Sequence, residues 1–236
     1  MLKDDFIKIS PLKILEHSSQ RSLGKGNLGV LIARAGVGKT ACLIHIALAN
    51  IFSQRKLFHV AIDESTEKVS AYYRTILSDL GKALNFVESE AEEMIVERNR
   101  IIMAYPGSRF SLDVLDKGIE NLIKAIDIKP DTLIIDGLDF ENVTRDMISG
   151  FKNLAEKHEV EIWLSALSHR HIRETNEKGI PHPCNRLDDL LSLIIYLDPT
   201  DDGVFLRLLK DHDVYLGSET SYKLDPATFL VADPQS

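Results

Sequence analysis

Residues 33–40, with the sequence ARAGVGKT, combine residue types that bind phosphate groups. Gly36 and Gly38 permit backbone conformations in which successive N–H groups turn inward toward phosphate oxygens. Lys39 supplies a cation for the outer phosphates, and the Thr40 hydroxyl can ligate Mg²⁺. We therefore expect this loop to hold a nucleoside triphosphate and its metal ion. The expected nucleotide-binding residues are Ala35, Gly36, Val37, Gly38, Lys39, Thr40 and Ala41.

The segments on either side of the loop supply the context that such a loop requires. The apolar run 28–33 predicts a buried strand, and residues 39–52, which lack glycine and proline, predict a buried helix. The amino end of that helix adds a positive dipole next to the bound phosphates. One position departs from the usual pattern, because Ala33 stands where glycine is expected. The strand–loop–helix order still makes a chance glycine-rich turn the weaker interpretation.

A second motif supports the first. Residues 131–136, DTLIID, form an apolar run that ends in an acid. In nucleotide-binding proteins with such a loop, an acid at this place holds Mg²⁺ directly or through water. Many strands end in an acid, so this run alone would carry little weight. Together with the phosphate-binding loop, it predicts that Thr40 and Asp136 are the Mg²⁺ ligands.

Composition indicates the broad class of protein to which the chain belongs. The chain has 236 residues, 44% of them hydrophobic, which suits one globular domain over 1–236 with an amino-terminal extension, 1–22, and a core, 23–236. The formal charge of −8 argues against sequence-independent nucleic-acid binding over the whole surface. Two cysteines suit a reducing compartment, and no signal-peptide or membrane-span pattern stands out. We expect a cytoplasmic protein without membrane association.

Apolar strands alternate with amphipathic helices along the chain, which predicts parallel strand–helix–strand units in a doubly wound α/β fold. Helical patterns disappear after residue 190, where an antiparallel hairpin extends the sheet. Predicted strands are 28–33, 57–62, 100–105, 132–135, 160–167, 190–197 and 204–210, followed by a strand-like run to 231; predicted helices are 39–52, 66–80, 88–98, 111–126 and 142–158.

Five places in a fixed order carry a family resemblance. They are 28–48, 59–69, 132–138, 161–170 and the late pair 187–197 with 205–214. Together they resemble the RecA superfamily of P-loop ATPases, nearest to its KaiC-like and DnaB-helicase-like branch, from about residue 23 to 230. The resemblance implies a three-layer RecA-like fold with a mostly parallel twisted sheet and a C-terminal antiparallel hairpin. It also implies ATP with Mg²⁺ as ligands and a homo-oligomer, often a hexameric ring.

The resemblance implies a catalytic carboxylate at the end of the strand after the phosphate-loop helix. Asp63 aligns best, and Glu64 follows it. The family usually has glutamate at the position of Asp63, and aspartate is one methylene shorter. A misplacement on the order of 1 Å can cost about 100-fold in rate. Either Glu64 therefore takes over, or turnover is slow. The alternative is an acidic turn that caps the next helix.

Three further site residues follow from the resemblance. His169, with Ser168 as its neighbour, stands at the sensor position that senses the γ-phosphate; a lone loop histidine is the competing interpretation. Lys210 and His212 occupy positions that reach the nucleotide of the adjacent subunit. The family has arginine where this chain has His212, and imidazole is mostly neutral near pH 7. That change weakens the case for fast, ring-dependent hydrolysis.

Two other interpretations concern the loop that follows the sensor strand. A zinc site is conceivable, since zinc takes tetrahedral nitrogen and sulfur ligands. Segment 168–186 also holds several basic residues, as do loops that bind single-stranded DNA, but it contains no Phe, Tyr or Trp for base stacking. Both interpretations are the weaker ones. The zinc ligands would be His169, His171, His182 and Cys184, and the basic residues are Arg170, Arg173, Lys178 and Arg186.

Three functions remain open at this point. The first is a KaiC-like regulatory ATPase whose nucleotide state is read by a protein partner. The second is a DnaB-like or recombinase-like motor on single-stranded DNA, which the acidic surface disfavours. The third is a nucleotide-binding switch with little turnover, which the departures at Asp63 and His212 keep open.

Overall fold

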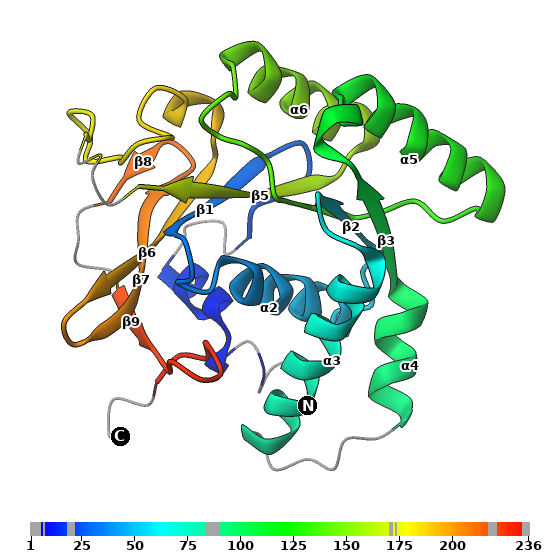
Figure 1. Cartoon of the computed structure of the whole chain (residues 1–236), viewed down its shortest axis with the longest axis horizontal. Helices are drawn as coiled ribbons and strands as arrows, with labels where there is room; N and C mark the ends of the chain where they lie inside the picture. The colour runs from blue at the N-terminus through cyan, green and yellow to red at the C-terminus, as the bar shows by residue number, and fades with distance from the viewer. Residues whose placement is uncertain are drawn as a thin grey trace.

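The computed structural model describes residues 6, 8–17, 22–83, 90–169, 172, 174–216 and 221–232. In these residues a nine-stranded mixed sheet lies between helices on both faces (Figure 1). The strands are β1 (Leu28–Arg34), β2 (Leu57–Ile62), β3 (Arg100–Tyr105), β4 (Thr132–Asp136), β5 (Glu161–Ser168), β6 (Leu193–Thr200), β7 (Gly203–Asp211), β8 (Val214–Tyr215) and β9 (Ser221–Leu224). The α-helices are α2 (Lys39–Phe52), α3 (Thr66–Ala83), α4 (Glu90–Asn99), α5 (Leu112–Ile126) and α6 (Arg145–His158).

The strand order is β3-β2-β4-β5-β1-β6-β7-β8, with β9 paired to β7. The first six strands in this order, from β3 to β6 and including β1 and β2, are parallel. Strand β6 then pairs with β7 in an antiparallel hairpin. The expected α/β class, the mostly parallel sheet and the C-terminal hairpin are therefore confirmed.

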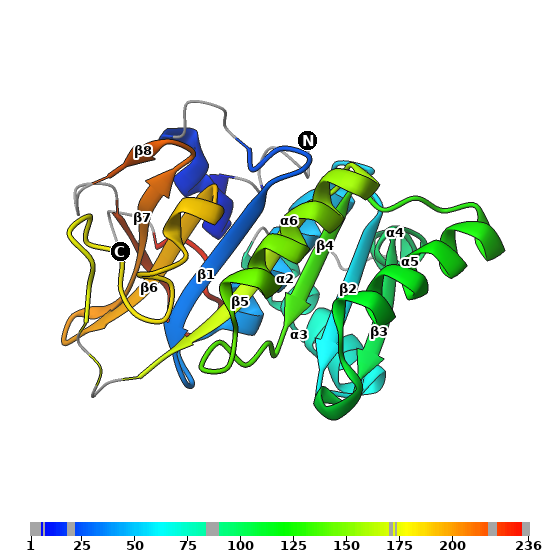
Figure 2. The same ribbon diagram turned by 90° about the horizontal axis from the view of Figure 1, so that it is seen from above.

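The two faces of the sheet carry different helices because crossover connections are right-handed. The chain moves from β1 through β2 to β3 with α2, α3 and α4 on one face, then returns from β3 through β4 to β5 with α5 and α6 on the other (Figures 1 and 2). Strands β2 and β4 are neighbours, but the chain continues from β2 to β3 on one side of the pair and from β4 to β5 on the other. Ligands of open α/β sheets bind at such a point, outside the carboxyl ends of the strands.

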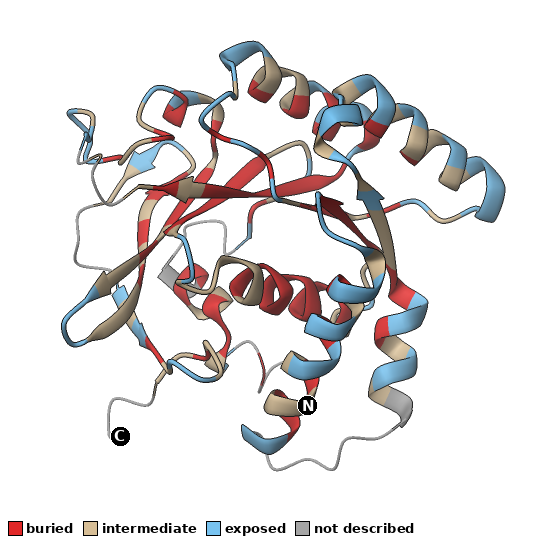
Figure 3. Cartoon of the chain, viewed as in Figure 1, coloured by how far each residue is buried: buried red, intermediate tan, exposed pale blue. Residues whose placement is uncertain are grey.

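The central strands and helix α2 form the interior (Figure 3). All of β2 and the first six residues of β1 are buried, as expected for parallel strands covered on both faces. Helix α2 is buried on almost every side because the amino-terminal segment covers it. Phe6 contacts the rings of His45 and Phe52, and Ile14 joins the same core. The described part of the amino-terminal extension is therefore packed into the domain.

Three predicted boundaries differ from the structure for local reasons. Helix α6 begins at Arg145 rather than 142, because Thr144 accepts a hydrogen bond from the Met147 N–H as its N-cap. Strand β6 begins at Leu193, after a 3₁₀ turn over Asp188–Leu190. The predicted final strand is wrong between 225 and 230, where the Asp225 carboxylate accepts N–H bonds from Ala227 and Thr228 and closes a turn. No helix within the described ranges combines the length and apolarity needed to cross a membrane.

Candidate functional site

The phosphate-binding loop leaves the carboxyl end of β1 and runs directly into α2. Gly36 and Gly38 both have positive φ, 75° and 96°, a conformation that other residues adopt only with strain. Gly38 also precedes the first helical residue, Lys39. A Cβ atom at Gly38 would lie 2.0 Å from the ring of Phe229, so the C-terminal turn closes over this glycine. The backbone therefore has the left-handed turns that an anion-binding loop needs.

Lys39 folds back over the end of β1. Its Nζ lies 3.4 Å from the carbonyl oxygens of both Ala33 and Arg34. These are long hydrogen bonds, since typical N–H···O distances are 2.7–3.2 Å. Burial lowers the pKa of Lys39, and the nearby Asp136 carboxylate opposes that shift. The ammonium group is therefore loosely held beside an acid.

Asp136, at the end of β4, links the loop to the neighbouring strand. Its Oδ2 accepts a 2.8 Å hydrogen bond from the Thr40 hydroxyl, and its Oδ1 accepts a 2.6 Å bond from Ser165 in β5. Ser165 in turn accepts a bond from the Gly137 N–H at 3.2 Å. Two residues separated by 96 positions, Thr40 and Asp136, thus present a hydroxyl and a carboxylate oxygen to one point. Ser165 was not among the residues predicted from the sequence, where its signal is a polar residue inside an apolar strand.

Asp63 and Glu64 follow β2 at the same edge of the sheet. Asp63 has a positive φ of 61°, and its Oδ1 accepts a 2.7 Å hydrogen bond from the Gly107 N–H. Glu64 instead forms a 2.6 Å ion pair with Lys68, one helical turn into α3. Both acids are exposed and border the same cavity. The structure therefore brings both candidate carboxylates to the site, with different partners.

In the described part of the structure, three cavities lie against Lys39, Thr40 or the loop glycines. One of about 250 Å³ lies between the ends of β2 and β4 and is bordered by Thr40, Asp63 and Asp136. A second, of about 360 Å³, lies on the other side of Asp136 and is bordered by Lys39, Ser165 and His169. A third, of about 400 Å³, adjoins Gly36–Ala41 and is lined by aromatic residues from distant parts of the chain, Tyr72 of α3 and Phe229 of the C-terminal turn.

His169 lies at the tip of β5, at the border of the second cavity. Its Nε2 lies 2.6 Å from a carboxylate oxygen of Glu141, which follows β4. Its neighbour Ser168 is buried and lines a separate cavity between β5 and the C-terminal hairpin. Of the two sensor candidates, the structure places only His169 at the cavity that contains Lys39.

Lys210 and His212 lie at the opposite edge of the sheet. Lys210 pairs with Ile194 near the start of β6, and His212 contacts the Leu23 carbonyl just before β1. Lys210 is only 5% exposed, and its Nζ donates to the carbonyls of Asp188 and Leu191 at 2.5 and 2.7 Å. These contacts give Lys210 a structural role within its own chain. Its action on a neighbouring nucleotide stays a prediction that this burial does not favour.

The loop after β5 offers little support for zinc or nucleic acid. Among the residues that the structure describes, no three His, Cys, Asp or Glu side chains gather as metal ligands. Burial strongly raises the pKa of the Cys184 thiol, which opposes the thiolate that zinc requires. Lys178 is paired with Asp188 at 3.1 Å. Three residues of these two interpretations, Arg170, His171 and Arg173, lie outside the described residues.

The chain matches no known protein-family model. It also matches no curated protein. The function therefore has to be inferred from the residues and geometry of the site itself.

Proposed function

We propose that this chain binds ATP with Mg²⁺ and hydrolyses it, using a RecA-like fold. The observation that carries the proposal is the 2.8 Å contact between the Thr40 hydroxyl and the Asp136 carboxylate. The two groups belong to two motifs that the sequence shows separately, the loop over 33–40 and the apolar run over 131–136, and the fold brings them into contact. A chance glycine-rich turn would have no reason to meet the acid of another strand.

The strand order supports the RecA-like part of the proposal. The loop-bearing strand β1 and the acid-bearing strand β4 are separated by β5, which contributes Ser165 and ends at His169. All three strands are parallel, so their carboxyl ends lie at one edge. That edge is where the chain directions diverge and where ligands of open α/β sheets bind.

The residues present fit a magnesium nucleotide. Mg²⁺ takes oxygen ligands and is usually held by one or two carboxylates together with phosphates. Thr40 and Asp136 supply such oxygens, and Ser165 orients the second carboxylate oxygen. When bound, the ion neutralises charge that develops on the transferring phosphoryl group. The loop N–H groups would hold the phosphates, and Lys39 would exchange its two long carbonyl contacts for phosphate oxygens.

The third cavity is suited to the base. Tyr72 is 41% exposed, and its ring and that of Phe229 line the same space next to the loop. Aromatic rings stack on bases at about 1–3 kcal/mol each. Asp79 also lines this cavity and can accept a hydrogen bond from an exocyclic amino group. The base would therefore lie between α3 and the C-terminal turn.

Asp63 is the better candidate to orient the attacking water. The turn after β3 holds its carboxylate through the Gly107 N–H, which leaves the second oxygen available. Glu64 is held at the surface by Lys68. Asp63→Asn should therefore lower the hydrolysis rate about 100-fold, while the matched change Glu64→Gln should lower it only a few-fold. A larger loss in Glu64→Gln would reverse the assignment.

The deciding experiment measures binding and turnover together. Titration with a fluorescent ATP analogue and Mg²⁺ should give saturable binding to the wild-type chain, and Asp136→Asn should abolish its dependence on Mg²⁺. Phosphate release is then measured with and without single-stranded DNA. DNA-stimulated release would favour the motor, and basal release the regulatory ATPase. Absence of nucleotide binding would refute the proposal. Light scattering with and without nucleotide tests the oligomer that the resemblance implies.

A nucleotide-binding switch with little turnover is the second candidate. The observation that favours it is that both acids near the site already have partners, Asp63 with Gly107 and Glu64 with Lys68. Tight nucleotide binding without phosphate release, unchanged in Asp63→Asn, would support the switch over the ATPase.

A further inference from the structure

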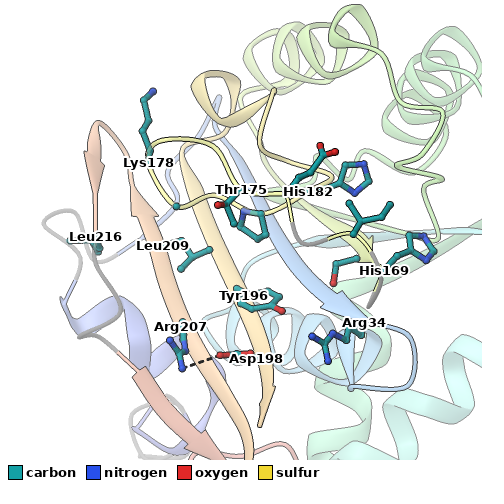
Figure 4. A pocket seen from close by; sticks show the side chains of 15 residues that line it. Arg34, His169, Thr175, Lys178, His182, Tyr196, Asp198, Arg207, Leu209 and Leu216 are labelled. Carbon is teal, nitrogen blue, oxygen red and sulfur yellow. Dashed lines mark ion pairs between the residues drawn. The ribbon is translucent and has the colours of Figure 1, made fainter.

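A cavity of about 420 Å³ lies behind the phosphate loop; it shares His169 with the second cavity described above but contains neither Lys39 nor Thr40. The β6–β7 hairpin forms its floor, the end of β1 one side, and the loop over 174–183 its roof (Figure 4). Its volume is within the range of small-molecule pockets. The lining mixes apolar residues, among them Leu209, Pro181 and Tyr196, with several cationic side chains.

Hydrogen-bonding atoms without partners gather in this cavity. Within the described residues, Ser168 Oγ, His182 Nδ1 and Arg207 Nε are buried and have no hydrogen-bond partner. All three residues line the cavity, and Ser168 is only 8% exposed. Leaving a buried polar group unsatisfied costs about 1–3 kcal/mol. These three groups therefore have hydrogen-bonding capacity that no described residue uses, and they belong to residues of one pocket.

The charges in the cavity favour an anion. Asp198 is neutralised by Arg207 at 2.9 Å. Arg34, by contrast, forms no ion pair with any described residue, and Figure 4 shows its guanidinium beside Tyr196. The other carboxylate of the lining, Glu174, belongs to the roof next to His182, since the Glu174 carbonyl accepts the His182 N–H. The end of the cavity near Arg34 therefore offers donors and uncompensated positive charge.

We propose that this cavity binds a small organic anion through a phosphate or carboxylate group. Arg34 would bind the anionic group in a two-pronged contact, the geometry that guanidinium favours. Ser168 Oγ and Arg207 Nε would donate further hydrogen bonds, and the organic part would contact Tyr196, Leu209 and Pro181. The site is independent of the ATPase proposal, because none of these interactions involves the phosphates or the metal ion.

The test uses the full chain carrying Lys39→Met, so that binding of the probe at the phosphate loop is strongly weakened. Inorganic phosphate, phenyl phosphate and benzoate are titrated separately by calorimetry. We expect phenyl phosphate or benzoate to bind at one site, more tightly than inorganic phosphate. Preference between the two organic probes identifies the natural anionic group as a phosphate ester or a carboxylate.

Matched variants in the same background locate the site. Arg34→Gln should weaken binding about tenfold and Ser168→Ala about threefold, since charged and neutral hydrogen bonds contribute to that extent. Arg98→Gln, the same change at an exposed arginine of α4, should have no effect. Circular dichroism checks that each variant is folded, and Ser168→Ala serves if Arg34→Gln is not.

Three results would overturn the proposal. The first is that none of the three probes binds. The second is that Arg98→Gln weakens binding as much as Arg34→Gln does. The third is that an oligothymidylate binds more tightly than any of the three probes and loses affinity in Arg34→Gln, which would make this cavity part of a nucleic-acid surface.

Discussion

Lys39 and Lys210 make the same kind of contact at opposite edges of the sheet. Each ammonium donates to two backbone carbonyls, and burial lowers the pKa of each. The distances differ, however: 3.4 Å for both bonds of Lys39, against 2.5 and 2.7 Å for Lys210. Lys39 is half-buried at the start of α2 and borders two cavities, whereas Lys210 is enclosed.

This difference separates a binding residue from a structural one. Long bonds at the edge of a cavity are weak and can be exchanged for phosphate oxygens at little cost. The short bonds of Lys210 in the interior join the segment around Asp188–Leu190 to strand β7. If the ammonium group is removed, water cannot reach the buried carbonyls to replace it as a donor. The two lysines should therefore respond in opposite ways to the same substitution.

Lys210→Met should produce the largest effect, on stability. It removes two charge-assisted hydrogen bonds. The Leu191 carbonyl loses its donor, and the Asp188 carbonyl keeps only a long 3.4 Å bond from the Leu191 N–H, so the free energy of unfolding should fall by about 2–4 kcal/mol. Denaturant unfolding measures it. Lys178→Met is the matched control. Lys178 is exposed, and the buried Asp188 carboxylate keeps its hydrogen bonds from Asn176 and Tyr215, so the loss should be only about 1 kcal/mol. Equal losses in both variants would contradict the structural role of Lys210.

Lys39→Met should act on binding instead. Loss of the ammonium group should weaken binding of the magnesium nucleotide about 100-fold, close to 2.7 kcal/mol. The free energy of unfolding should change by less than about 0.5 kcal/mol, because the two carbonyl contacts are long. Nucleotide titration and denaturant unfolding of the same sample give both numbers. The comparison fails if Lys39→Met destabilises the chain as much as Lys210→Met does.

Substitution by alanine should destabilise the chain by different amounts at Gly36 and Gly38, because the two glycines have different surroundings. Both have positive φ, so alanine costs roughly 1 kcal/mol at either position. A Cβ atom added at Gly36 would meet no described atom within 4 Å, whereas one at Gly38 would collide with the Phe229 ring. Gly38→Ala should therefore cost about 1–3 kcal/mol more than Gly36→Ala. Adding Phe229→Ala to each variant tests the cause, since it should remove that difference.

The smallest predicted effect is the pH dependence of nucleotide affinity. Burial lowers the pKa of Lys39 below 10.5, and the phosphates bind its protonated form. Affinity should thus be full at neutral pH and decline as the pH rises through the lowered pKa, reaching about half where half of Lys39 is deprotonated. Titrations between about pH 7 and 10.5 measure this. Lys39→Met should lack this decline, and an identical decline in that variant would assign it to another group.

The sequence predicted those parts of the site that depend on contiguous residues. The loop over 33–40, the buried helix after it and the acid of β4 all follow from local residue types and their order. Helix boundaries were close, with α6 shifted because the Thr144 cap was not recognised. The strand predicted near 225–230 is a turn, since the side-chain bonds of Asp225 outweigh the apolar pattern there.

The sequence did not predict the roles of single residues whose contacts lie in distant parts of the chain. Ser165 contacts Asp136 only because β5 lies beside β4. Tyr72 and Phe229 line one cavity only because the C-terminal turn returns to the loop. The family pattern predicted that Lys210 reaches outward, yet packing encloses it. The sequence indicated Arg34 only as a member of the phosphate-binding loop, whereas the structure places it at a cavity that contains neither Lys39 nor Thr40.

By itself, then, the sequence determined the alternation of strands and helices and the phosphate-binding loop, because periodicity, glycine and backbone hydrogen bonding act over a few residues. Only the tertiary structure decided which lysine is held loosely and which is enclosed, and which serine meets Asp136. Those outcomes depend on strand order and burial, which bring together residues from distant parts of the chain.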